Sequence, residues 1–239
     1  MKRRPTAPVP ALLLALLLAP GLAVARAQEE APAGEAPAEM AAETASPDSI
    51  RTFEQAIPTG DAASVHAILR IGDLEVVGTA GTEAKAVVTV RCDSGEQDRC
   101  ADAARKIGLS WVRDNTVLRL RVTGTSRISS RHISVSTHLE VPQMLPLEID
   151  VGVGDVFMKQ VAADVEVDVG AGDVNLSFSR GDVRAVNLDV NAGAAELYVD
   201  GGKVEGSGLV HKALNWKSGA GRAVVEVDVG SGDARIRLD

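Results

Sequence analysis

Aromatic residues make up only 3% of this 239-residue chain, and histidine occurs only four times. Enzymes that act on polysaccharides typically bind their substrate in a groove lined with aromatic side chains, so the composition argues against that class. The sequence contains no GxSxG or HExxH motif, and its histidines show no metal-ligand spacing. We therefore predict no catalytic residues, no cofactor, no cofactor-binding residues and no metal ligands, and we expect a protein that is not an enzyme.

The sequence also lacks an apolar run of the roughly 20 residues that a transmembrane helix needs. Its longest run, residues 11–25, follows the basic start Lys2-Arg3-Arg4 and leads into the small residues Ala25-Arg26-Ala27. This order is typical of a secretory signal peptide. We predict that residues 1–27 are removed, with an uncleaved anchor as the alternative. The mature protein then has no membrane span and is periplasmic or secreted.

Residues 28–50 are rich in alanine, glutamate and proline and show no apolar periodicity, which predicts a disordered tether. Loss of the four basic residues of the signal peptide changes the net charge from −8 to −12. A chain this acidic is a poor partner for nucleic acid, because phosphates bind basic surfaces. We expect its partner to be another envelope protein or a surface ligand.

Cysteine is rare too, and the chain contains only Cys92 and Cys100. Export to an oxidising compartment favours a disulfide between them. Cys92 lies on the inward face of a predicted strand, and Cys100 lies on the apolar side of a helix predicted between Ser94 and Gly108. We predict a Cys92–Cys100 bond. A metal or redox pair is less favoured, because the sequence has no CxxC spacing.

A repeated phrase, rich in glycine, organises the second half of the chain. Its copies are Asp150-Val-Gly-Val-Gly-Asp155, Asp168-Val-Gly-Ala-Gly-Asp173, Asp228-Val-Gly-Ser-Gly-Asp233 and the worn Asp189-Val-Asn-Ala-Gly-Ala194. Apolar and polar residues alternate before and after each copy, which is the pattern of half-buried strands. The glycines indicate sharp corners. Calcium-binding solenoids have similar corners but a nine-residue period, so we interpret these as plain turns and keep calcium binding as an alternative.

The spacing of the corners predicts how the strands stack. Corners at Gly152, Gly170 and Asn191 are 18 and 21 residues apart. A period near 20 favours a short β-solenoid, or β-helix-like repeat, in which equivalent strands stack in parallel. The corners at Gly219 and Gly230 are only 11 residues apart, which predicts a hairpin-like cap. An antiparallel meander is the alternative.

We predict two halves that form one continuous all-β domain. Residues 51–146 form an N-terminal β-rich half with one small helix, including a hairpin over residues 109–122. Residues 147–239 form the Gly-x-Gly-Asp repeat half. In the last strand, Ala234, Ile236 and Leu238 face inward.

Stacking in register would align the outward residues of the repeats at the ~4.8 Å strand spacing. The resulting surface, which we call the acidic face, contains Glu148, Asp150, Glu166, Asp168, Asp189, Glu226 and Asp228. The last two join it only if the final repeat enters the same sheet. Like charges opposite one another are destabilising. We interpret the face either as a solvated surface screened by salt or as one that recruits a divalent cation or a basic partner.

Two further phrases carry a family resemblance. Arg70-Ile-Gly-Asp-Leu-Glu-Val-Val-Gly78 opens the domain, and His138-Leu-Glu-Val-Pro-Gln-Met-Leu-Pro-Leu-Glu-Ile-Asp150 leads into the repeats. In this order, between Val65 and Leu238, the chain resembles the bacterial putative-adhesin family, a domain of unknown function built from short β-strand repeats. The resemblance implies a β-helix-like fold in an exported or envelope protein and brings no catalytic residues.

The sequence therefore predicts a non-enzymatic β-repeat module that acts as an adhesin-like binding protein or a structural protein of the cell envelope. Two alternatives stay open. One is an envelope stress-response scaffold that binds another envelope protein through a sheet edge. The other is a polysaccharide-acting enzyme built on a β-helix.

Overall fold

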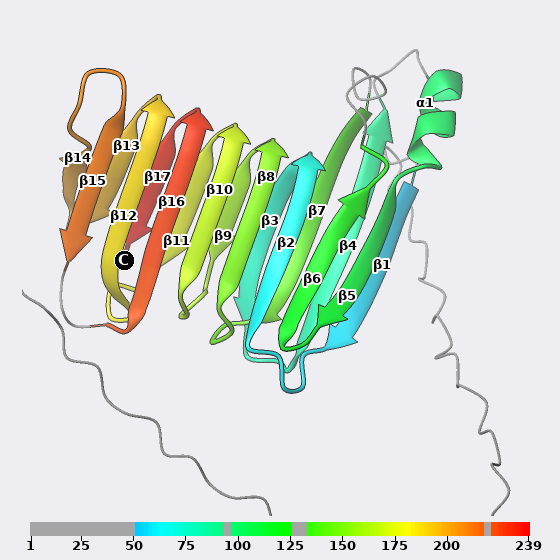
Figure 1. Ribbon diagram of the computed structural model, residues 1–239, viewed down its shortest axis with the longest axis horizontal. Coiled ribbons are helices and arrows are strands. Elements are labelled where there is room, and N and C mark those ends of the chain that lie inside the picture. Colours follow the sequence, from blue (N-terminus) through cyan, green and yellow to red (C-terminus); the bar gives the residue numbers. More distant parts are fainter. Residues whose placement is uncertain (1–50, 93–96, 126–132, 218–220) are drawn as a thin grey trace, which may run out of the picture. The chain divides into compact units, whose positions relative to one another are not determined.

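The alternating pattern produces strands through most of the chain that the computed structural model describes, residues 51–92, 97–125, 133–217 and 221–239. These residues form two mixed β-sheets and one short helix, α1 (Gln97–Ala104). The sheets lie face to face (Figure 1), and buried side chains from both fill the space between them. The all-β prediction is confirmed. The predicted signal peptide and tether lie outside the described residues, as does Ser94.

The order of the strands across each sheet differs from their order along the chain. From one edge to the other, the nine-stranded sheet contains β1 (Arg51–Pro58), β4 (Glu83–Cys92), β7 (Ile133–Pro142), β3 (Asp73–Thr79), β9 (Val156–Lys159), β11 (Val174–Phe178), β17 (Ala234–Leu238), β13 (Ala195–Val199) and β14 (Gly202–Glu205). The eight-stranded sheet contains β15 (Lys212–Lys217), β12 (Val183–Ala192), β16 (Ala223–Ser231), β10 (Val165–Ala171), β8 (Leu147–Val153), β2 (Ser64–Ile71), β6 (Val117–Thr123) and β5 (Gly108–Asp114).

Five pairs of strands share one plan, which we call an arch: a strand of the eight-stranded sheet, a sharp corner, and a strand of the nine-stranded sheet. The arches are β2–β3, β8–β9, β10–β11, β12–β13 and β16–β17. Neighbouring arches pair in parallel and in register, so Val167 of β10 lies beside Ile149 of β8 and Val227 of β16. All three side chains are buried. Burial of each such side chain contributes about 1.5–3 kcal/mol.

The corners allow the arches to approach closely because they are built on glycine. Gly172 has a φ of 145°, and a Cβ on it would lie 2.0 Å from the carbonyl oxygen of Gly154 in the neighbouring arch. Any other residue would therefore strain the backbone and also push the arches apart. The corner glycines are thus required by the stacking itself.

The aspartate after each corner glycine links one arch to the next. Its Oδ1 accepts a hydrogen bond from the backbone N–H at the same position of the neighbouring arch. The bonds run from Asp155 N to Asp73 (3.1 Å), Asp173 N to Asp155 (2.8 Å), Asp233 N to Asp173 (2.8 Å) and Ala194 N to Asp233 (2.9 Å). Hydrogen bonds to an ionised carboxylate are stronger than those between neutral groups. The corner aspartates therefore have a structural role.

The last arch in the sequence lies inside the stack and not at its end. Figure 1 shows β16, in red, between β12 and β10, and β17 lies between β13 and β11. The predicted C-terminal cap is therefore wrong, although Ala234, Ile236 and Leu238 do face the core. Because β16 and its corner repeat the pattern of β10, the arch fits between two others as well as it would fit at an end.

This order explains why the repeat at residues 189–194 ends in alanine, where the other copies end in aspartate. The arch β12–β13 is the last of the stack, and its outer neighbours, β15 and β14, run antiparallel to it. The backbone N–H of Ala194 donates to Asp233, but no further corner follows that would donate to a carboxylate at position 194. An alanine is sufficient there.

Antiparallel strands close both ends of the stack. Besides β14 and β15, the pairs β1–β4, β4–β7 and β5–β6 run antiparallel. The described residues therefore form two mixed sheets and not a closed solenoid, because antiparallel strands flank the parallel arches and the arches do not stack in chain order. The antiparallel meander is also wrong for the repeats, since they pair in parallel.

The N-terminal half contains the predicted hairpin and helix. Strands β5 and β6 pair across Asp114 and Asn115, and Asn115 has the positive φ of 53° that a tight turn requires. A disulfide joins Cys92 at the end of β4 to Cys100 in α1. Arg51 donates to the carbonyl oxygens of Ala104 (3.2 Å) and Ile107 (3.0 Å), and these bonds tie β1 to the C-terminal end of the helix.

The corner hydrogen bonds give the first testable prediction. Asp173→Ala removes the carboxylate that accepts the Asp233 N–H, and we expect the free energy of unfolding to fall by about 1–3 kcal/mol. Urea unfolding followed by circular dichroism measures this loss. Asp61→Ala is the control, because it removes an exposed carboxylate that pairs with Arg113 and should cost less than about 1 kcal/mol. Equal losses in both variants would contradict a structural role for the corner aspartate.

Candidate functional site

The acidic face lies on four adjacent parallel strands of the eight-stranded sheet, in the order β8, β10, β16 and β12. One row contains Glu148, Glu166, Glu226 and Asn187, and the next contains Asp150, Asp168, Asp228 and Asp189. These residues alternate with buried apolar ones, so their side chains face solvent. The structure brings all seven predicted carboxylates together and places Glu226 and Asp228 inside the rows.

Burial and mutual repulsion raise the pKa values of three carboxylates of the acidic face. Burial and the charges of Asp228 and Asp150 raise the pKa of Asp168. Burial and the charge of Asp168 raise the pKa of Glu166, and burial and the charge of Asp189 raise the pKa of Asp228. Desolvation and like charges both disfavour the ionised form. Two unit charges ~5 Å apart repel by about 1 kcal/mol even in water, so the ionised face destabilises the free protein.

Two histidines border the acidic face. His66 of β2 lies beside Glu148, and its Nε2 is 2.7 Å from Asp150 Oδ2. At the opposite border, His211 Nε2 is 2.6 Å from Asp189 Oδ1. These contacts were not predicted from the sequence, because each joins residues from separate parts of the chain.

A signal for the first contact was nevertheless present in the sequence. The corner at Gly72 matches the corner at Gly154, and residues six positions before these glycines are His66 and Glu148. Stacking the two corners in register is sufficient to place His66 next to Glu148.

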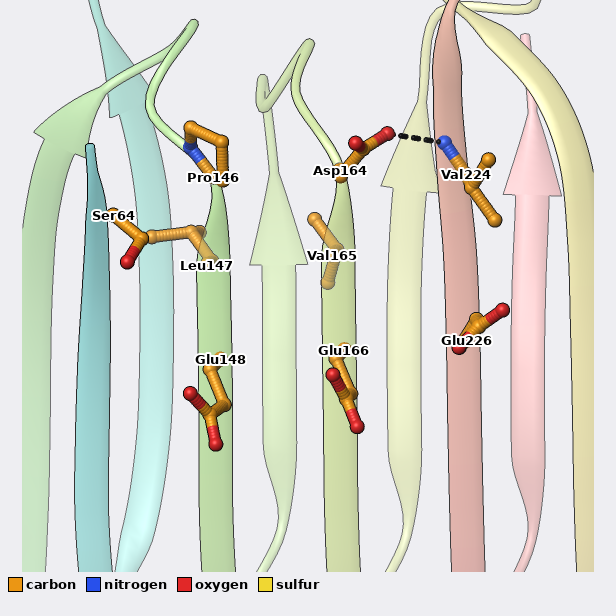
Figure 2. A pocket seen from close by; sticks show the side chains of 9 residues that line it. All are labelled: Ser64, Pro146, Leu147, Glu148, Asp164, Val165, Glu166, Val224 and Glu226. Atoms are coloured by element: carbon orange, nitrogen blue, oxygen red, sulfur yellow. Dashed lines mark hydrogen bonds between the residues drawn. The ribbon is translucent and has the colours of Figure 1, made fainter. Parts of the chain in front are cut away.

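Two hollows flank the carboxylate rows. A shallow pocket of about 430 Å³ lies along the glutamate row, where Glu148, Glu166 and Glu226 project from neighbouring strands (Figure 2). A groove of about 360 Å³ lies beyond the aspartate row, over Gly170 and its neighbours. A Cβ on Gly170 would lie 2.5 Å from the Gly152 carbonyl oxygen, so a side chain does not fit at this position of the groove. The hollows leave room for groups of a partner on both sides of the carboxylates.

The chemistry of the face is that of hydrogen-bond acceptors. Ionised carboxylates accept hydrogen bonds and donate none. They bind arginine, lysine and metal cations through short, charge-assisted contacts. The arrangement can therefore bind cationic groups.

Comparison with solved structures identifies the fold. A crystal structure of a putative cell adhesion protein from Clostridium sporogenes matches with a TM-score of 0.50 and 15% sequence identity, over 79% of this chain and 99% of that one. The chain has the fold of that putative cell adhesion protein. A putative adhesin from Bacteroides fragilis matches over 80% of this chain and 99% of its own, with 10% identity and a TM-score of 0.32. The resemblance to putative adhesins is confirmed at the level of the fold.

No protein-family model matches the chain, and no curated protein matches it. Among the described residues, no helix has the length and apolar character needed to cross a membrane.

The raised pKa values predict that neutralising the face stabilises the protein. Because the folded-state pKa of Asp168 lies above its ordinary value of 3.8, ionisation costs stability as the pH rises through the folded-state pKa. Asp168→Asn should therefore raise the melting temperature by about 2–4 °C at pH 7, equivalent to roughly 1 kcal/mol. The gain should shrink as the pH falls toward 3.8.

Melting curves of both proteins across this pH range provide the measurement. The exposed Asp61→Asn serves as the control and should show no such gain. A lower melting temperature for Asp168→Asn at pH 7, or a gain that does not depend on pH, would contradict the account.

Proposed function

We propose that the protein is an exported, non-enzymatic binding module of the cell envelope, and that it recognises a basic partner through the acidic face. The observation that supports this most strongly is the pair of in-register carboxylate rows. Their mutual repulsion costs the free protein stability, and a cationic partner would relieve that cost. Binding energy can therefore come from removing repulsion as well as from new contacts.

The shape of the face favours arginine and lysine side chains as the groups that bind. A guanidinium forms two parallel hydrogen bonds with a carboxylate, and the rows offer carboxylates on adjacent strands. The long aliphatic stems of these side chains can lie along apolar surface while their charged ends reach the rows. The hollows on both sides of the rows would take such stems.

An exported location is consistent with two further observations. The disulfide between Cys92 and Cys100 suits an oxidising compartment. The fold is shared with a protein described as a putative cell adhesion protein. Both support a role outside the cytoplasm, in which contact with another molecule is the activity.

Two variants with equal net charge test this proposal. The first removes four of the seven charges of the face with Glu166→Gln, Asp168→Asn, Glu226→Gln and Asp228→Asn. The second removes four exposed carboxylates elsewhere, with Asp61→Asn, Glu83→Gln, Asp102→Asn and Glu205→Gln. A photo-crosslinking residue at Asn187, within the glutamate row, reports what contacts the face in the native envelope. The same crosslinker at Ser177, on the other sheet, controls for random encounters.

We expect an adduct with a basic protein from position 187 that is lost in the first variant and kept in the second. Equal adducts from both positions, or an adduct that both variants keep, would refute the proposal. A divalent cation is the competing occupant. It is indicated if millimolar calcium chloride raises the melting temperature well beyond sodium chloride of equal ionic strength, and if Asp168→Asn removes that difference.

A further inference from the structure

One histidine and two carboxylates meet where β2 joins the acidic face. His66 Nε2 is 2.7 Å from Asp150 Oδ2, and His66 Nδ1 is 3.7 Å from Glu148 Oε2. One ligand atom from each of the three residues lies within 4.8 Å of those of the other two. The His66 side chain is only 13% exposed and is held between paired strands, whereas Glu148 and Asp150 are about half exposed and can adjust.

The imidazole distinguishes this cluster from the rest of the acidic face. Carboxylates alone suit calcium or magnesium, but a nitrogen ligand shifts the preference toward zinc and other transition metals. Zinc sites commonly combine histidine with aspartate or glutamate, at about 2.0–2.2 Å from the metal. Asp168 and Glu166 on the next strand add negative potential without competing for His66, while Arg119, beside His66 on β6, pairs with Asp114 at 3.0 Å.

The other two histidines in the described part of the chain provide an internal comparison. His138 also lies between two carboxylates, Glu75 (3.1 Å) and Glu140 (3.5 Å), but the Lys159 ammonium already occupies Glu75 at 2.9 Å. His211 contacts one carboxylate, that of Asp189, and the amide oxygen of Asn191.

The cluster at His66 differs from both. Glu148 and Asp150 form ion pairs with His66, and among the described residues they form none with lysine or arginine. Of the three clusters, it is therefore the one with two carboxylates and no ammonium in place.

We propose that His66, Glu148 and Asp150 form a binding site for a divalent transition metal, with zinc as the best match. Three protein ligands leave one position of a tetrahedral zinc for water or for a donor from a partner. The site requires only these three side chains and does not depend on the basic partner proposed above. It lies at the β8 border of the acidic face, so a metal there would remain accessible from solvent.

Isothermal titration of the protein with zinc chloride tests the site, using protein without a polyhistidine tag. We expect one equivalent to bind, and we expect His66→Gln to weaken binding at least tenfold. Asp150→Asn should also weaken it. His138→Gln is the matched control, because it removes a histidine flanked by two carboxylates from the other sheet, and it should bind zinc like the unchanged protein.

A second readout separates metal ligation from general charge effects. Binding of cobalt(II) should produce visible d–d absorption that zinc abolishes and that His66→Gln lacks. Melting curves in EDTA check that His66→Gln is folded. Zinc binding by His66→Gln equal to that of the unchanged protein, or calcium and magnesium binding as tightly as zinc, would overturn the proposal.

Discussion

The in-register contact between neighbouring arches is the interaction on which the rest of the structure depends. It aligns buried valines in continuous rows, and it brings corner backbones so close that only glycine fits. It also places each corner aspartate where it accepts the N–H of the next arch. The corner glycines and aspartates thus stabilise the contact between neighbouring arches in addition to forming the turn within one arch. For this reason a Gly-Asp pair recurs at the corner of every arch that another arch follows in the stack.

The same register produces the surface on which function is proposed. When similar repeats stack without offset, similar outward residues must lie side by side. Asp150, Asp168 and Asp228 occupy equivalent positions of three repeats, so the stacking that buries their valine neighbours also aligns their charges. The outward carboxylates add no core packing, and burial together with like charges nearby raises the pKa of Asp168 and of Asp228. The proposed binding role would account for residues that the fold does not need.

Much of the fold and of the acidic face could be predicted from the sequence, because the alternation of apolar and polar residues and the glycine corners are local signals. They indicated the arches, their inward residues, the cysteine pair and the composition of the acidic face. The order of the arches could not be predicted, since nearly identical repeats can stack on one another in any order. The predicted corner at Gly219 lies outside the described residues, whereas Gly221 packs against the backbone of Asp182 just before β16. The contacts of His66 were not predicted from the sequence, because they depend on which arches are neighbours in the sheet.

Pairs of engineered cysteines test the stacking order most directly. Neighbouring residues of parallel strands lie ~4.8 Å apart, within disulfide range, whereas residues two strands apart do not. With β16 between β10 and β12, mild oxidation should crosslink Glu226→Cys to Glu166→Cys, and Glu226→Cys to Asn187→Cys. The pair Glu166→Cys and Asn187→Cys should stay reduced. Rapid crosslinking of that third pair, with none between Glu226→Cys and Glu166→Cys, would show that the arches stack in chain order and would contradict the account.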